Sequence, residues 1–156
     1  MNKSTDNFNL GLISTYQAGV VQSQAHRRLK KEVSEFLKPF GLTMMEWFAL
    51  GLIKDSEHTG IRLTELSAEL QTTLPYTTNL INGLMYKGFI NRQSDGGDNR
   101  AKNLKLAPGI ADKCEEIEKD LRTKMRLLIY SNISAKDLNT YVKVLYLIAN
   151  QTNLKE

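Results

Sequence analysis

The chain has 156 residues, a formal net charge of +4 and a pI near 9.1, with 41% hydrophobic residues. This length fits one domain, or a small domain with an oligomerisation element, and the basic balance is compatible with a polyanionic partner without requiring one. A single cysteine excludes an internal disulfide framework and fits a reducing compartment. Because the sequence shows neither a signal-peptide core nor an apolar run long enough to span a bilayer, we expect a cytoplasmic protein with no membrane partner.

The first part of the chain predicts two helices. Apolar residues recur at helical spacing over residues 10–37, and Pro39 with Gly41 ends that helix. Thr43 and Glu46 have the spacing of a capping box, in which each side chain bonds the backbone N–H of the other, so a second helix begins there. This second helix carries Trp47, whose simplest role is in the core, with the wall of a ligand pocket as the less common alternative.

Two short helices are expected next, one within residues 61–70 with its apolar stripe running from Leu63 onward, and one from Pro75 to Gly88, separated by Gln71-Thr72-Thr73. Thr64 is the expected cap of the first, Pro75 suits the first turn of the second, and Gly88 suits a left-handed stop. The second helix has an apolar inner face, predicted to comprise Leu80, Ile81, Leu84 and Met85. Its outer face is aromatic and amide rather than charged, with Tyr76, Asn79, Asn82 and Gly83. A solvated surface would be the simpler interpretation of that face taken alone.

A hairpin follows the two helices directly. Residues 89–92 and 103–106 read as strands joined by a loop that contains Gly96-Gly97, where positive φ angles are needed. The hairpin is basic, with Arg92, Arg100, Lys102 and Lys105 against Asp95 and Asp98. A helix-turn-helix followed by such a hairpin is the order needed to place one helix in a DNA major groove and the hairpin along phosphate or the minor groove.

The last third predicts two more helices with apolar stripes. Ile110, Cys114, Ile117, Leu121 and Leu128 lie close to a heptad seam, and Asn132 interrupts it. Ser134 with Asp137 indicates another capping box, which opens a final helix carrying Leu138, Tyr141, Val142, Leu145 and Ile148. Terminal helices this long cannot bury their stripes within so small a domain, whereas a second copy of the chain can cover them.

Four segments together resemble the winged helix-turn-helix of the multiple-antibiotic-resistance regulator (MarR) family, closest to its SlyA-like branch. They are GLTMMEW at 41–47, LTELSAEL at 63–70, LPYTTNLINGLMYKGFINR at 74–92 and DNRAKNLKLAPG at 98–109. The resemblance implies a mainly α fold, an α+β winged helix-turn-helix lobe with N- and C-terminal helices that form a dimerisation lobe. It implies one MarR-type domain over 1–156, with the DNA-binding lobe at 43–107 and dimerisation helices at 10–40 and 109–152.

By this resemblance the protein is a sequence-specific, dimeric transcription regulator, a repressor that binds a palindromic operator in double-stranded DNA. Asp98-Asn99-Arg100 matches the family's wing signature, so Arg100 would enter the minor groove and Asp98 would orient the wing. The residues expected to serve DNA binding are Thr73, Pro75, Tyr76, Thr77, Asn79, Arg92, Asp98, Arg100 and Lys102. Asn79 and Asn99 depart from basic residues common in the family, and Ala107-Pro108 replaces a threonine cap.

The resemblance also implies control by a small aromatic anion bound where the dimerisation helices meet the DNA-reading lobe. His26, Arg27 and Trp47 are the expected ligand residues, although surface roles for His26 and Arg27 and a core role for Trp47 are the simpler interpretations. We expect no cofactor and no metal, since His26 and His58 are too few and too far apart for a site. Cys114 lies on an apolar seam and is expected to be a buried structural thiol rather than a redox sensor.

Two other functional classes stay open at this stage. A winged-helix module that has lost operator reading and docks a protein partner is the main alternative, although loss of Arg100 or of the polar helix face would have favoured it more. An enzyme is the weakest option. The sequence has no phosphate-binding glycine loop, no HExxH or CxxC motif, and no Ser/His/acid set with interpretable spacing, so no catalytic residue is predicted.

Overall fold

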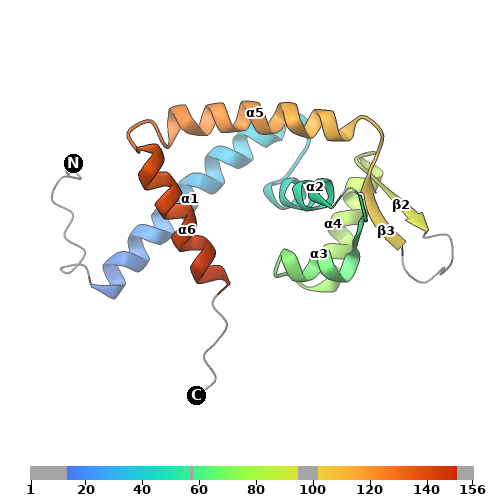
Figure 1. The fold of residues 1–156 in the computed structure, drawn as a ribbon, viewed down its shortest axis with the longest axis horizontal. Helices are drawn as coiled ribbons and strands as arrows, with labels where there is room; N and C mark the ends of the chain where they lie inside the picture. Colours follow the sequence, from blue (N-terminus) through green and yellow to red (C-terminus); the bar gives the residue numbers. More distant parts are fainter. Residues whose placement is uncertain (1–13, 57, 95–101, 151–156) are drawn as a thin grey trace, which may run out of the picture. The chain divides into compact units, whose positions relative to one another are not determined.

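The computed structural model describes residues 14–56, 58–94 and 102–150, and for residues 92–94 and 102 it describes the backbone alone (Figure 1). The described part is mainly helical with one small antiparallel sheet, as expected for an α+β winged helix. The helices are α1 (Thr15–Leu37), the 3-10 helix η3 (Lys38–Phe40), α2 (Met44–Asp55), α3 (Leu63–Glu69), α4 (Leu74–Tyr86), α5 (Ile110–Leu128) and α6 (Ala135–Ala149). The strands are β1 (Ile61–Arg62), β2 (Ile90–Ser94) and β3 (Lys102–Leu106).

The chain divides into two compact units after Trp47. In the first unit, Ser14 caps α1, since its hydroxyl accepts from the Gln17 N–H at 3.4 Å and the Gln17 side chain accepts from the Ser14 N–H at 3.1 Å. The predicted stop is confirmed, because η3 follows α1 and Gly41 takes a φ of 69°. The first residues of the helix predicted over 10–37 lie outside the described part.

The predicted capping box of α2 is present. The Thr43 hydroxyl accepts from the Glu46 N–H at 3.2 Å, and the Glu46 carboxylate accepts from the Thr43 N–H at 2.8 Å. These two bonds satisfy donors that the first turn of a helix leaves without a partner.

Among the described residues no single helix is long and apolar enough to cross a membrane. One bent pair of helices, Thr15–Phe40 with Met44–Asp55, has the length and composition for a broken span, and only length and composition support it.

The sheet of the second unit has the strand order β1-β3-β2, with both pairs antiparallel. Ile61 of β1 pairs with Leu104 of β3, and α3 begins at Leu63, where the predicted apolar stripe begins. Thr64 is not the cap of α3. That position belongs to Arg62, whose backbone N–H donates to the Glu65 carboxylate at 2.9 Å. The strand partner of Ile61 is 43 residues away, and local sequence could not indicate it.

The second unit buries apolar side chains from its helices and from all three strands. Side chains that are less than 2% exposed include Leu50, Ile53, Leu66, Ile81, Leu84, Leu104 and Ile117. Ile81 and Leu84 belong to the predicted inner face of α4, whereas Leu80 and Met85, predicted beside them, are only partly buried. Gly88 takes a φ of 77°, which confirms the left-handed stop after α4.

Helices α5 and α6 follow the sheet. On α5 the buried face comprises Cys114, Ile117, Leu121 and Met125, while Leu128 is 48% exposed, so the predicted seam is wrong at its last position. Helical spacing of four residues continues from Leu121 to Met125 rather than to Leu128. Gly109, with a φ of 78°, stands at the N-cap of α5, so Pro108 lies ahead of the first turn and not in it. Ser134 caps α6 as predicted, accepting from the Asp137 N–H at 3.1 Å.

Gly60 makes the tight entry into β1. Its φ is +70°, and a Cβ added there would lie 2.8 Å from the Cβ of Asn103 on β3. The Asn103 side-chain amide in turn donates to the Thr59 carbonyl at 3.1 Å, which fixes the loop against the strand. A side chain at residue 60 would therefore combine backbone strain with a close contact.

We expect Gly60→Ala to lower the free energy of unfolding by about 1–3 kcal/mol, because alanine disfavours this φ and overpacks Asn103. Gly51→Ala is the matched control, since Gly51 lies inside α2 with nothing within 4 Å of an added Cβ. Helix propensity should make that variant more stable by about 0.5–1 kcal/mol. Urea unfolding of both variants measures this difference, and equal stabilities would contradict the role given to Gly60.

Candidate nucleic-acid interface

One face of α4 is turned to solvent and carries aromatic and amide groups. From Tyr76 onward its exposed residues recur at intervals of three or four, which places Tyr76, Asn79, Asn82 and Tyr86 on one stripe of the helix. Leu74 and Pro75, in the first turn, are exposed as well. The helix has no charged residue over Leu74–Tyr86. Hydrogen-bonding groups without net charge suit contact with base edges, whose pattern of donors and acceptors carries the sequence information of DNA.

The start of α4 is also exposed. Thr73 stands at the N-cap, and its hydroxyl accepts from the Tyr76 N–H at 3.4 Å. Pro75 lies in the first turn, as predicted, where its missing N–H costs no hydrogen bond. Since the N-terminus of a helix carries partial positive charge, this end of α4 favours a neighbouring phosphate.

Thr77 is not part of the exposed face, so its predicted contact with DNA was wrong. Its side chain is fully buried, with its hydroxyl 2.8 Å from the Thr72 hydroxyl and donating to the Thr73 carbonyl at 3.1 Å. A threonine among polar neighbours reads as a surface residue in sequence. Only the packing of α4 against the rest of its unit decides that this position points inward.

Strands β2 and β3 form the antiparallel hairpin that follows α4, and their residues pair in a defined register. Arg92 lies opposite Leu104, and Lys102 lies opposite Ser94, so the backbones of both predicted basic residues belong to the paired strands. Asp98 and Arg100, predicted at the tip of the wing, lie outside the described residues. Thr73, Pro75, Tyr76 and Asn79 are thus gathered at the exposed part of α4, and Arg92 and Lys102 are placed in the hairpin at the level of the backbone.

Tyr86 was not predicted as a site residue. Its side chain is 94% exposed at the C-terminal end of α4, on the same stripe as Asn79 and Asn82. The helical spacing of seven residues from Asn79 is a signal that sequence reading could have used. An aromatic ring this exposed can stack or pack on a partner that covers the helix.

The N-terminal part of α5 is fastened to the lobe that holds α4. The Lys54 ammonium lies 3.0 Å from the Glu115 carboxylate, and the Lys113 ammonium lies 5.0 Å from the centre of the Phe89 ring. The hydrogen bond with Glu115 raises the pKa of Lys54. Cys114 lies between Lys113 and Glu115 in the sequence and is buried. Burial raises the pKa of its thiol, so the thiol stays protonated at neutral pH and behaves as a small apolar side chain.

The residues predicted to hold a ligand lie in the first unit. His26 and Arg27 are exposed on α1, and Trp47 is half-buried near the start of α2. Among residues 14–56, 58–94 and 102–150, no group of three or more His, Cys, Asp or Glu side chains is arranged to hold a metal ion.

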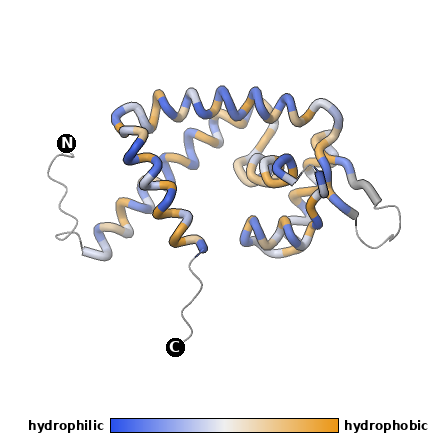
Figure 2. The backbone as a smooth tube through the Cα atoms, viewed as in Figure 1, coloured by the Kyte–Doolittle hydropathy of each residue, from blue (hydrophilic) through white to orange (hydrophobic). Residues whose placement is uncertain are grey.

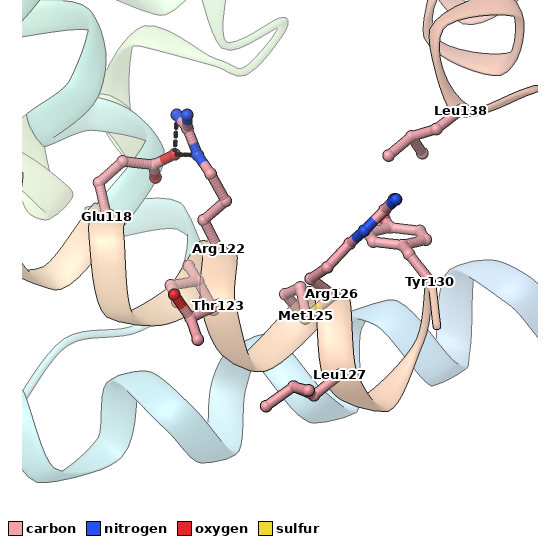
Figure 3. A pocket seen from close by; sticks show the side chains of 9 residues that line it. Glu118, Arg122, Thr123, Met125, Arg126, Leu127, Tyr130 and Leu138 are labelled. Carbon is pink, nitrogen blue, oxygen red and sulfur yellow. Dashed lines mark hydrogen bonds and ion pairs between the residues drawn. The ribbon is translucent and has the colours of Figure 1, made fainter. Parts of the chain in front are cut away.

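A groove of about 560 Å³ lies elsewhere, between the C-terminal half of α5 and the start of α6 (Figure 3). Apolar side chains make up much of its lining, with Leu138 facing it from α6 and the polar ends of Arg126 and Tyr130 at its edge. Arg122 is held by Glu118 at 2.9 Å. The full lining is Glu118, Leu121, Arg122, Thr123, Met125, Arg126, Leu127, Tyr130 and Leu138.

Comparison with known proteins places this architecture. Residues 42–102 match the MarR family. A segment of 83 residues is 28% identical to the HTH-type transcriptional regulator PrsX of Escherichia coli, and this match covers 53% of the chain and about half, 50%, of that relative. The fold is similar to AbsC, a MarR family transcriptional regulator from Streptomyces coelicolor, with a TM-score of 0.75 and 19% identity over 88% of this chain and 94% of that one.

The fold is also similar to the MepR chain in a crystal structure of an S. aureus MepR–DNA complex. The TM-score is 0.70 at 23% identity, over 88% of this chain and 98% of that one. The relatives named here are transcriptional regulators, and the narrower resemblance to the SlyA-like branch stays a prediction. Residues 42–102 match the MarR family, and the helix-turn-helix with its antiparallel wing strands has the fold seen in the solved structures of MarR family regulators.

Proposed function

We propose that this protein is a sequence-specific, dimeric DNA-binding transcription regulator that represses its targets and is released from DNA by a small ligand. The observation that carries the proposal is the uncharged, hydrogen-bonding outer face of α4 beside an antiparallel hairpin. The similarity to the MepR chain crystallised with DNA supports the same interpretation. Such a regulator acts where the chromosome is, in the cytoplasm.

The domain arrangement belongs to the same proposal. Residues 43–107 form the DNA-binding lobe, and residues 10–40 and 109–152 supply dimerisation helices within one MarR-type domain. The alternative is a winged-helix module that docks a protein and no longer reads DNA. Selection of bound duplexes from a random pool separates the two, because a protein-docking module would enrich no common sequence.

Asn79 is proposed to read a base. It is exposed in the first half of α4, and a side-chain amide can hydrogen-bond adenine N6 and N7 as a bidentate pair. Tyr76, at 45% exposure, precedes it by three residues and lies on the same side of the helix.

We expect an A·T pair under Asn79 and a loss of about 1–3 kcal/mol in binding free energy for Asn79→Ala, confined to that base pair. Alanine forms helices better than asparagine, so the variant should be as stable as the wild type in thermal unfolding, or more stable. This measurement distinguishes a loss of base recognition from a loss of folded protein. Titration of duplexes with each base at that position measures the effect. A uniform loss over all duplexes would make Asn79 a phosphate contact instead.

The wing is proposed to bind the DNA backbone and the minor groove, with Arg92, Asp98, Arg100 and Lys102 as its residues. This part of the proposal rests on the family's wing signature in the sequence and on the paired strands that carry Arg92 and Lys102. Phosphate contacts of this kind add affinity without sequence preference.

Replacing Arg100 by Ala should weaken binding to selected and scrambled duplexes alike. The slope of log affinity against log salt should fall by about one unit for each phosphate that the arginine neutralises in each subunit. Lys136→Ala, which removes one charge from exposed α6, is the control and should leave the slope unchanged. An unaltered slope for Arg100→Ala would mean that the wing does not contact DNA, and it would favour the protein-docking alternative.

Dimerisation is proposed because the terminal helices expose more apolar surface than a monomer normally tolerates. On α1, Tyr16, Val20 and Val21 are each more than half exposed. Figure 2 shows hydrophobic residues recurring along α6, and none of its side chains is buried. The exposed apolar residues of α6 are Tyr141, Val142, Val144, Leu145, Tyr146, Leu147 and Ile148.

We expect Leu145→Glu to give a monomer at micromolar concentration in sedimentation, because a partner would bury the added carboxylate in an apolar contact. The palindromic operator, with half-sites about 10 base pairs apart, should then bind more weakly. Thr140→Glu adds the same charge to α6 on a different side of the helix and should remain dimeric. A Leu145→Glu variant that stays dimeric would contradict this interface.

Ligand control is proposed through a small aromatic anion that binds at His26, Arg27 and Trp47. Two exposed basic side chains on α1 and a half-buried indole supply charge and an apolar surface for such a molecule. A ligand releases DNA only if it prefers the arrangement that does not fit the operator, so operator DNA must weaken the ligand by the same factor.

Fluorescence of Trp47, the single tryptophan, should change saturably with a panel of phenolic acids, and operator DNA should compete with them. Arg27→Ala should abolish the response, whereas Arg126→Ala, a matched change in the α5–α6 groove, should preserve it. The reverse pattern would move the site to that groove. No response across the panel would end the case for ligand control at these residues.

A further inference from the structure

Hydrogen bonds through Ser67, Thr72 and Thr77 join the inner side of α4 to α3. The Ser67 hydroxyl of α3 donates to the Thr72 carbonyl at 2.9 Å, and the Thr72 hydroxyl lies 2.8 Å from that of Thr77. Since the Thr77 hydroxyl proton is directed at the Thr73 carbonyl, 3.1 Å away, the Thr72 hydroxyl is the donor in the bond between them. Ser67 is 7% exposed and Thr77 is fully buried, so water competes little for these bonds.

Thr72 is fixed to both helices. Its N–H donates to the Ser67 carbonyl at 3.0 Å, and the Gln71 N–H donates to the Ala68 carbonyl at 3.0 Å. With a φ of 49° at Gln71, these are the two bonds of a Schellman ending for α3. Backbone and side-chain bonds therefore hold Thr72 to α3, while its hydroxyl reaches the inner side of α4.

Around a helix each residue turns by about 100°, so Tyr76 and Asn79 lie about 100° and 200° from Thr77. A hydroxyl that fixes Thr77 inward therefore directs Asn79 outward, nearly on the opposite side of the helix. Side chains end about 5–6 Å from the helix axis, and a rotation of about 20° would displace the Asn79 amide by about 2 Å. A bidentate bond to a base does not survive such a displacement, because hydrogen-bond distances vary by only a few tenths of an ångström.

We propose that Thr77, acting through Thr72 and Ser67, is a positioning residue that sets the rotation of α4 and thereby the sequence preference of the protein. The inference rests on the proposed function, in which α4 reads bases. Thr77 itself contacts no DNA. Its role is to suppress rotated arrangements of α4 in which Tyr76 and Asn79 still touch the duplex but lose their register with the base edges.

The test compares two substitutions at this one position. Thr77→Val keeps the shape and removes the hydroxyl, whereas Thr77→Ser keeps the hydroxyl and removes a buried methyl group. Each variant is titrated with a duplex selected by the wild-type protein from a random pool and with a scrambled duplex of the same composition. We expect Thr77→Val to lose about tenfold in the ratio of the two affinities, the equivalent of one buried hydrogen bond, while Thr77→Ser stays near the wild-type ratio.

Thermal unfolding of the two variants separates a loss of sequence preference from a loss of stability. Thr77→Ser leaves a cavity where the methyl group was, and Thr77→Val removes the buried acceptor of the Thr72 hydroxyl, so we expect both variants to unfold at a lower temperature than the wild type. A merely structural role would lower stability and sequence preference together in both variants. Ser67→Ala removes the side-chain bond from α3 to Thr72 while the backbone bonds and α4 stay unchanged, and it should lower the affinity ratio in the same direction but less strongly.

The outcomes separate the positioning role from the proposed function. A wild-type protein that selects no duplex would overturn the proposed function and the positioning role with it. A wild-type protein that selects a duplex, with Thr77→Val retaining the full affinity ratio, would overturn the positioning role alone. If Thr77→Ser lowered the ratio of the two affinities as strongly as Thr77→Val, the methyl group rather than the hydroxyl would position α4. The role given to the hydroxyl would then be rejected.

Discussion

The rotation of α4 about its own axis is the constraint on which the proposed interface depends. The helix has thirteen residues and turns one side into an apolar core and the other to solvent. Ile81 and Leu84 supply the apolar anchor, which resists withdrawal of the helix but is tolerant of small rotations because hydrophobic burial has no direction. The buried Thr77 hydroxyl adds a directional bond, and directional bonds are what distinguish one rotation from another.

The small sheet fixes the position at which the hairpin leaves the helices. β1 has only two residues, yet it pairs with β3 and so ties the segment ahead of α3 to the wing. Gly60 and the amide of Asn103 form the close contact that makes this short strand possible. The base of the wing is therefore part of the same folded unit as α3 and α4.

Helix α5 connects two different environments. Its N-terminal part is fastened by Lys54 to Glu115 and by Lys113 to the Phe89 ring, and its buried face continues as far as Met125. Beyond that point Leu127 and Leu128 are exposed, the α5–α6 groove opens, and α6 buries none of its residues. Burial of these apolar side chains would stabilise an assembly by roughly 25 cal/mol for each Å² covered, which is the physical reason to expect a second copy there.

Local features of this protein could be predicted from the amino-acid sequence. The capping box at Thr43, the N-cap at Ser134, the stop at Gly41 and the left-handed turn at Gly88 follow from local sequence, because these residues bond or bend the backbone within a few positions. The resemblance over four segments agrees with the family match over residues 42–102. Helical spacing alone also separated the apolar side of α4 from the side that carries Tyr76 and Asn79.

Tertiary packing was needed to determine which residues of mixed character point inward and which segments pair at a distance. Thr77 and Tyr86 demonstrate this most clearly, since a polar residue became core and a large aromatic residue became 94% exposed. Ile61 lies in a strand because it pairs with Leu104, a residue far away in the sequence. Hydroxyl groups are compatible with either water or a buried acceptor, so the placement of a threonine depends on an acceptor that folding brings within about 3 Å.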